Sequence, residues 1–314
     1  MQNKRTLVNK DLFIRAAILM TPCIFITGCL MPDQTKLPSG PEYYQNSKVK
    51  LIGETLYAGL GNYSVESMEL PNLNESVWRH KVWYPSDLQR KSGTYPIVVL
   101  ANGSGTTYSM YEATFRHLAS WGFVVIGNND MHSWSGKSAT ESLNLLISAN
   151  KNVSSVLYQR LDLNNIGMAG GSQGGVGAVN AVTNSTASVR FASLFTASMP
   201  GLQLSENLKW SYKIGKVEVP TFMVSSTGKF DSGGISPLSA LEDNAQGMGV
   251  SVPVITARRK NVDHEEMWTA VDGYMTAWFA WTLKKDKRAE KIFKGPNSEL
   301  EHNPNWQNVT SKNI

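Results

Sequence analysis

Short runs of apolar residues alternate along this sequence with segments of helical periodicity. Continuous apolar runs of about four to eight residues are typical of strands that are covered on both faces, and helices commonly connect parallel strands. The alternation therefore predicts an α/β fold with a mainly parallel central sheet and helices on both faces. Strands are expected at residues 77–85, 95–102, 123–130, 166–169, 220–226 and 252–257, and helices at 110–122, 138–150, 173–184 and 265–285.

The stretch "MAGGSQGGVGA", residues 168–178, holds five glycines around one serine and one glutamine. It follows a predicted strand and opens a predicted helix, and its "GGSQG" fits the G-x-S-x-G nucleophile elbow. The serine stands at the apex of such a turn, where side chains at Gly170 or Gly174 would collide with neighbouring backbone. Ser172 is therefore predicted to be a nucleophile at the carboxyl end of the sheet. The alternative is a glycine-rich turn that only packs a helix against a strand.

A serine nucleophile needs a base, and in this architecture the chain order is serine, acid, histidine. Three of the five histidines precede Ser172, and His302 lies in the polar C-terminal segment. His264 follows the serine within the domain, in the loop after the predicted strand 252–257. An imidazole on that loop could reach over the sheet, so His264 is predicted to be the base.

The predicted acid is Asp231, in the segment "SSTGKFDSGGISP". It comes just after the predicted strand 220–226, again at the carboxyl end of the sheet. Glu242 and Asp243 fall in a predicted helix, and Asp263 adjoins His264 in sequence and would have difficulty reaching its ring. Asp231 is therefore the residue expected to orient the imidazole.

Two backbone N–H groups are predicted to form an oxyanion hole. One belongs to Gln173, which directly follows the nucleophile. The second is expected from the loop "ANGSGTTYS", where Gly103 would allow Ser104 to present its N–H to the cleft. A simple glycine turn is the alternative for this loop.

The N-terminus predicts export and lipidation. Residues 1–28 combine a basic start with the apolar run 16–26, which is too short for a membrane-spanning helix but suits a secretory signal. Its ending "ITGC" resembles a bacterial lipobox, so Cys29 is expected to carry lipid. The residue after it is Leu30 and not an acidic residue, which favours the outer membrane or periplasm of a Gram-negative cell. An ordinary cleaved signal is the alternative. Residues 29–50 are predicted to be a tether, 51–295 the domain and 296–314 a polar C-terminal tail.

Charge and cysteine content exclude several function classes. The formal charge is +5, but without residues 1–28 the chain has 26 basic and 24 acidic residues, a net of +2. Nucleic acid is therefore not expected as a partner. Cys23 and Cys29 are the two cysteines, and Cys23 would leave with the signal peptide. The mature chain is then expected to have no disulfide and no cysteine-based metal site.

Across residues 77–295 the chain resembles the α/β-hydrolase fold, and within it bacterial cutinases and polyester hydrolases of the dienelactone-hydrolase type. The segments that carry the resemblance are "PIVVLANGSG", "RHLASWGFVVI", "MAGGSQGG", "KFDSGGISP" and the C-terminal helix with its "FKG" turn. It implies Ser172, Asp231 and His264 as the triad, with the N–H groups of Ser104 and Gln173 as the oxyanion hole. It implies no cofactor and no metal.

The sequence departs from these relatives in its substrate-facing positions. They commonly carry histidine before the nucleophile and methionine after it, where this chain has Gly171 and Gln173. Their oxyanion residue is often aromatic, where this chain has Ser104, and their C-terminal disulfide is absent. The triad is unaffected, whereas binding of a polyester is expected to differ.

The function expected from the sequence is a lipid-anchored serine hydrolase that cleaves carboxylic esters through an acyl-enzyme. Its partners would be an ester substrate and, through the N-terminal lipid, a membrane. An acyltransferase that uses the same acyl-enzyme is one alternative. A non-catalytic binding lipoprotein on a hydrolase scaffold is another.

Overall fold

The computed structural model describes residues 51–71, 76–184 and 189–314. The predicted signal peptide, the lipidation site Cys29 and the tether 29–50 lie outside the described residues. Within the described part of the chain, no helix is both long enough and apolar enough to cross a membrane.

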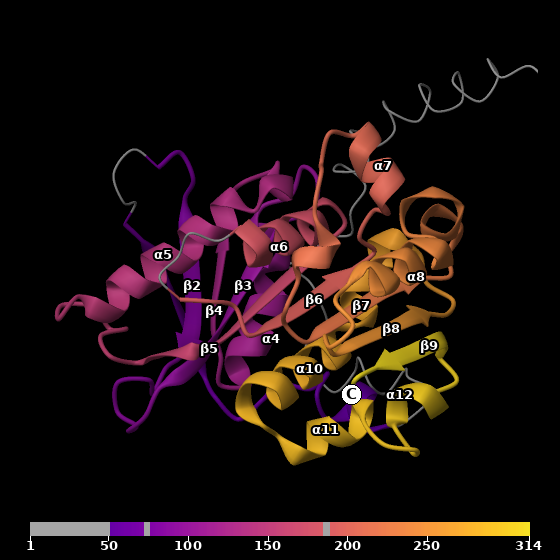
Figure 1. Cartoon of the computed structure of the whole chain (residues 1–314). Helices are drawn as coiled ribbons and strands as arrows, with labels where there is room; N and C mark the ends of the chain where they lie inside the picture. The colour runs from indigo at the N-terminus through magenta and orange to yellow at the C-terminus, as the bar shows by residue number, and fades with distance from the viewer. Residues whose placement is uncertain (1–50, 72–75, 185–188) are drawn as a thin grey trace, which may run out of the picture.

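The described strands form one sheet of nine, in the order β1-β2-β4-β3-β5-β6-β7-β8-β9 (Figure 1). The strands from β4 to β8 in that order are mutually parallel, whereas the pairs β1–β2, β2–β4 and β8–β9 at the two edges are antiparallel. The mainly parallel sheet predicted from the sequence is confirmed. The strands are β1 (Val65–Leu70), β2 (His80–Pro85), β3 (Tyr95–Ala101), β4 (Val124–Asn128), β5 (Leu161–Gly171), β6 (Ser193–Ala197), β7 (Thr221–Ser226), β8 (Val254–Arg259) and β9 (Trp306–Lys312).

Helices cover both faces of the sheet, as predicted. Central strands such as β3, β4, β6 and β7 are buried along their whole length, which explains why their sequences are mainly apolar and carry no charged residue. One core layer includes residues of α5, α6 and α8, and the other includes residues of α4, α9, α10 and α11 (Figure 1). The helices are α3 (Ile52–Thr55), α4 (Glu112–Ser120), α5 (Lys137–Lys151), α6 (Gln173–Asn184), α7 (Leu202–Asn207), α8 (Leu238–Gly247), α9 (Met267–Ala270), α10 (Asp272–Lys284), α11 (Lys287–Phe293) and α12 (Glu299–His302).

The C-terminal segment differs from the prediction. Residues 296–314 were expected to form a polar tail outside the domain, but they contribute α12 and β9, and β9 pairs with β8. Trp306 at the start of β9 is 3% exposed and packs against Tyr274 and Phe222. The segment is polar because most of β9 is an exposed edge strand, for which a polar outer face is normal.

The long helix expected at 265–285 is also interrupted. A short 3₁₀ turn at His264–Glu266 leads into α9, and the backbone leaves helical geometry at Val271 before α10 begins. His264 and Trp268, before the break, line the pocket described below. After the break, α10 packs against one face of the sheet.

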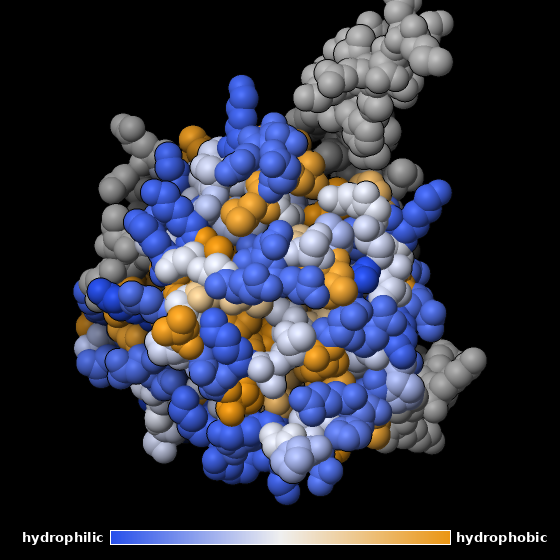
Figure 2. Space-filling view, turned by 45° about the vertical axis from the view of Figure 1, so that its right-hand side comes forward, coloured by the Kyte–Doolittle hydropathy of each residue, from blue (hydrophilic) through white to orange (hydrophobic). Residues whose placement is uncertain are grey.

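The protein surface carries some exposed apolar side chains among polar ones. On the face seen in Figure 2, apolar residues are scattered among polar ones. Exposed large apolar side chains among the described residues include Ile52, Leu56, Leu60, Val77, Val153 and Val250. Some exposed apolar side chains are normal for a folded domain.

Candidate active site

Ser172 occupies a sharp turn between β5, which ends at Gly171, and α6, which begins at Gln173. Its φ is 53°, in the left-handed region that non-glycine residues rarely adopt. Close packing fixes the turn: a Cβ at Gly170 would lie 2.0 Å from the Gly174 carbonyl oxygen, and one at Gly174 would lie 2.2 Å from that of Ala101. The strand and helix therefore meet backbone to backbone, and the serine projects from the apex.

Asp231 and His264 lie on two loops that follow the carboxyl ends of the neighbouring strands β7 and β8, and their side chains are in contact. Asp231 opens a single π-helical turn after β7, and His264 opens the 3₁₀ turn that follows β8. The His264 ring Nδ1 lies 2.6 Å from Asp231 Oδ1, and both residues are buried, with Asp231 fully so. The structure thus brings the predicted acid to the predicted base.

The second oxygen of Asp231 is also hydrogen-bonded. The Ser198 hydroxyl and the Ser226 backbone N–H, at 3.0 Å, both donate to Oδ2. Burial by itself would raise the pKa of Asp231, but the hydrogen bond and charge of His264, with the two serine donors, outweigh it and hold the pKa below its usual value. The carboxylate is therefore ionised and can only accept hydrogen bonds.

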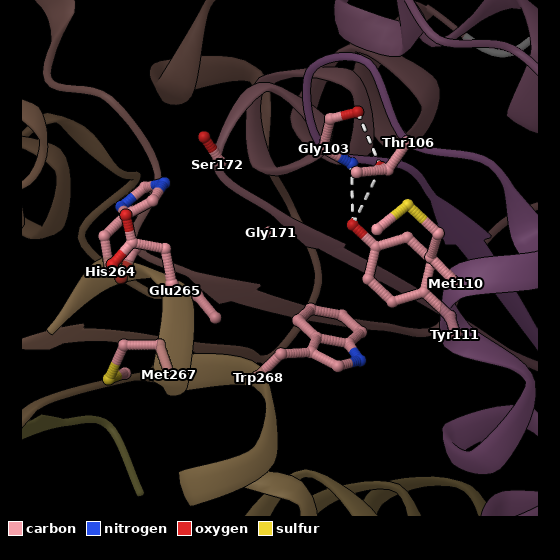
Figure 3. A pocket seen from close by; sticks show the side chains of 12 residues that line it. Gly103, Thr106, Met110, Tyr111, Gly171, Ser172, His264, Glu265, Met267 and Trp268 are labelled. Atoms are coloured by element: carbon pink, nitrogen blue, oxygen red, sulfur yellow. Dashed lines mark hydrogen bonds between the residues drawn. The ribbon is translucent and has the colours of Figure 1, made fainter. Parts of the chain in front are cut away.

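An ionised Asp231 fixes the tautomer of His264. Because the carboxylate accepts, the Nδ1 of the neutral ring carries the proton, and Nε2 is left with a free lone pair. The Ser172 hydroxyl lies beside this ring in one pocket (Figure 3). This is the arrangement in which an imidazole can take a proton from a serine.

The loop after β3 carries the predicted second oxyanion donor. The Gly103 N–H is occupied, because it donates to the Tyr111 hydroxyl at 3.1 Å, and the same hydroxyl contacts the Thr106 hydroxyl at 3.0 Å (Figure 3). In the part of the chain that the structure describes, the N–H groups of Ser104 and Gln173 donate no hydrogen bond. Gly103 and Thr106 line the pocket beside Ser172, whereas the predicted donors Ser104 and Gln173 are not among its lining residues.

The pocket beside Ser172 is narrow, with a volume of about 30 Å³. Trp268 forms one wall: it is 6% exposed, its Nε1 donates to the Thr114 hydroxyl at 3.1 Å, and its ring meets Tyr111 edge-on. Gly171 makes room for this indole, since a Cβ there would lie 3.0 Å from the ring. Further lining residues are Met110, Ala197, Ser198, Glu265 and Met267.

Sequence reasoning missed several residues of this site. Ser198 follows β6, a five-residue strand that was not predicted, and its own φ of 49° places its hydroxyl on the acid. Trp268 was assigned to the interior of a continuous helix. A positional signal existed for Trp268, because it lies four residues after the predicted base, whereas Ser198 had none.

The described residues contain no group of three or more histidine, cysteine, aspartate or glutamate side chains arranged to hold a metal ion.

A strained serine between strand and helix, with a histidine–aspartate pair on loops at the same sheet edge, is the arrangement of the α/β-hydrolases. A profile of the PET hydrolase-like family matches residues 52–306. The chain belongs to that family, which is one of ester hydrolases with the α/β-hydrolase fold. The predicted resemblance to polyester hydrolases is thereby confirmed. No curated protein matches the sequence.

Proposed function

We propose that this protein is a serine carboxylic-ester hydrolase in which Ser172 is the nucleophile, His264 the general base and Asp231 the orienting acid. The observation that carries the proposal is the 2.6 Å bond between His264 Nδ1 and Asp231 Oδ1, in a pocket shared by His264 and the strained Ser172. Family membership supports an ester-cleaving activity, and this geometry supports the roles proposed for the three residues.

In the first half-reaction the Ser172 oxygen attacks the ester carbonyl carbon while His264 Nε2 takes the hydroxyl proton. Asp231 stabilises the imidazolium that forms, without itself being protonated. The carbonyl oxygen becomes an oxyanion, for which the N–H groups of Gln173 and Ser104 are the proposed donors. A donor of this kind contributes about 10²–10³-fold to kcat.

The first half-reaction ends when the tetrahedral intermediate collapses: the imidazolium gives its proton to the departing alkoxide, and the alcohol leaves with Ser172 acylated. In the second half-reaction a water molecule gives a proton to His264 Nε2 while its oxygen attacks the acyl carbon. The second tetrahedral intermediate then collapses and releases the acid, and the Ser172 oxygen takes the proton back from His264.

A fluorophosphonate probe tests this assignment directly, because it phosphonylates an activated serine. The purified protein should be labelled, and peptide mapping should find the adduct on Ser172. An unlabelled protein contradicts the proposal and favours a binding role, whereas labelling at a different serine contradicts the assignment of Ser172.

We also propose that the acyl group accepted beside Ser172 is small. The pocket volume of about 30 Å³ is far below the ~300–1,000 Å³ of sites that enclose drug-sized ligands. Its wall cannot easily retreat, since Trp268 is held by Thr114 and flanked by Tyr111 and Phe195.

p-Nitrophenyl acetate should therefore have a higher kcat/KM than the butyrate or octanoate ester. Trp268→Ala should shift this preference by about tenfold or more toward butyrate, because each buried methylene gains about 0.8 kcal/mol. Trp210→Ala, at a half-buried tryptophan that does not line the pocket, is the control. An unchanged chain-length profile in Trp268→Ala would show that this wall does not set specificity.

Export and lipid anchoring through Cys29 form a further proposal, which rests on the signal-like residues 1–28 and the "ITGC" motif. Two or three acyl chains on Cys29 should partition the mature protein into detergent, as dual acylation gives stable membrane binding. Cys29→Ser should leave the protein unprocessed or in the aqueous phase, measured by Triton X-114 partitioning. Identical partitioning of the variant contradicts lipidation.

A further inference from the structure

One carboxylate outside the triad ties the loop of the acid to the loop of the base. Asp263 precedes His264 and accepts the His264 N–H at 2.8 Å, which caps the 3₁₀ turn. The same carboxylate accepts the backbone N–H groups of Phe230, at 2.9 and 3.1 Å, and of Asp231, at 3.1 Å. Two loops that are more than 30 residues apart in sequence thus share one hydrogen-bond acceptor.

We propose that Asp263 is a positioning residue that sets the distance between Asp231 and His264; the proposal rests on the function proposed above. On the triad residues and on Phe230, the Asp263 carboxylate binds backbone N–H groups. It therefore acts on the chemistry through the placement of those residues. A shift of about 1 Å in such a placement can cost on the order of 10²-fold in rate.

The residues around Asp263 allow the loop of Asp231 to approach it closely. A Cβ at Gly228 would lie 2.2 Å from Asp263 Cγ and 2.5 Å from its Cα, so the acid loop can pass over Asp263 only with glycine there. Asp263 is also held from its own side, because its N–H donates to the Glu266 carboxylate at 2.9 Å. Phe230 adds an edge-on contact with the His264 ring, with 5.4 Å between centroids.

The chemistry of the contact favours a carboxylate over an amide. Oδ1 accepts from His264, Asp231 and Phe230, and Oδ2 accepts a second bond from Phe230. Asparagine has one acceptor oxygen, and its NH₂ would face the N–H of Phe230. Asp263→Asn should therefore keep part of the link, and Asp263→Ala should remove it.

The expected result is a graded loss of kcat on p-nitrophenyl acetate, about 3–10-fold in Asp263→Asn and about 10–100-fold in Asp263→Ala, with KM little changed. Asp286→Ala is the matched control, since Asp286 caps α11 in the same way by accepting the Arg288 N–H at 2.8 Å. It should lose stability without losing kcat.

A double-mutant cycle separates positioning from general loss of structure. If Asp263 acts through Asp231, then Asp263→Ala should slow fluorophosphonate labelling strongly in the wild-type background and by less than about threefold in Asp231→Ala. Losses that multiply in the double variant, or a wild-type kcat in Asp263→Ala, overturn the proposal. If the alanine variant does not fold, Asp263→Asn carries the same cycle.

A second readout does not depend on turnover. The proton between His264 Nδ1 and Asp231 should give a low-field NMR resonance that is broadened or lost in Asp263→Ala and retained in Asp286→Ala. If the wild type shows this resonance but neither cleaves esters nor reacts with the probe, the proposed function fails while the positioning role stands. An unaltered resonance in Asp263→Ala refutes the positioning role.

Discussion

Ser172→Ala is expected to lower kcat for p-nitrophenyl acetate by about 10⁴-fold or more. The loss should be this large because the flanking residues Gly171 and Gln173 offer no substitute nucleophile. A small residual rate above that of water should remain, since the backbone N–H donors and the substrate-binding surface are unchanged. The kcat values of the variant and the wild type are compared from progress curves at saturating substrate. The protein concentration is measured by absorbance at 280 nm, because active-site titration would fail in this variant.

The fold of this variant should be intact, although Ser172 lies at a strained position with φ 53°. Alanine tolerates that conformation no better than serine, so circular dichroism must accompany the kinetics. Ser154→Ala, at an exposed serine in a turn away from the pocket, should retain full activity. Near-normal turnover by folded Ser172→Ala would refute the serine mechanism.

Asp231→Asn is expected to lower kcat/KM by about 10²–10⁴-fold near neutral pH. The side-chain volume is preserved, but the charge that stabilises the imidazolium is lost, and the amide can donate to Nδ1 and stabilise the wrong tautomer. Asp243→Asn is the matched control, because Asp243 is exposed on α8 and should leave the rate unchanged. A fully active Asp231→Asn would mean that another group is the acid.

The pH dependence of stability should report the ionisation of Asp231. The pKa of Asp231 is held below its usual value because hydrogen bonds and the His264 charge outweigh the effect of burial. Its contribution to stability is therefore complete above the unfolded-state value of about 3.9 and is lost as the pH falls through the folded value. Unfolding free energies measured as the pH falls below that value check this loss.

The sheet was largely predictable because its signal is local. Each of β3, β4 and β7 contains a short apolar run, and burial on both faces of the sheet is a common reason for such a run. β6 escaped prediction because its five residues, "SLFTA", include two hydroxyl side chains that are buried among neighbours from other elements. β9 escaped because an edge strand with an exposed face has the composition of a tail.

The residues of the proposed active site also divide into those that the local sequence predicts and those that it does not. Residues 168–178 specify the elbow by themselves, because the glycines and the serine act within one turn of chain. Chain order and position after predicted strands were enough to select Asp231 and His264. For Asp263, sequence reasoning considered only whether its side chain could reach the neighbouring ring. The backbone of Phe230 and Asp231, which it binds, is adjacent only in three dimensions.

The sequence by itself determined a mainly parallel α/β sheet, a serine on a glycine-rich turn, and an acid and a base in later loops, because each depends on short-range pattern or chain order. The tertiary structure alone decided the 2.6 Å contact between His264 and Asp231, the support of that acid by Ser198 and of its loop by Asp263, and the closure of the pocket by Trp268. These features depend on how separate loops pack at one sheet edge. Contacts between distant segments are fixed by the whole core, so no short stretch of sequence specifies them.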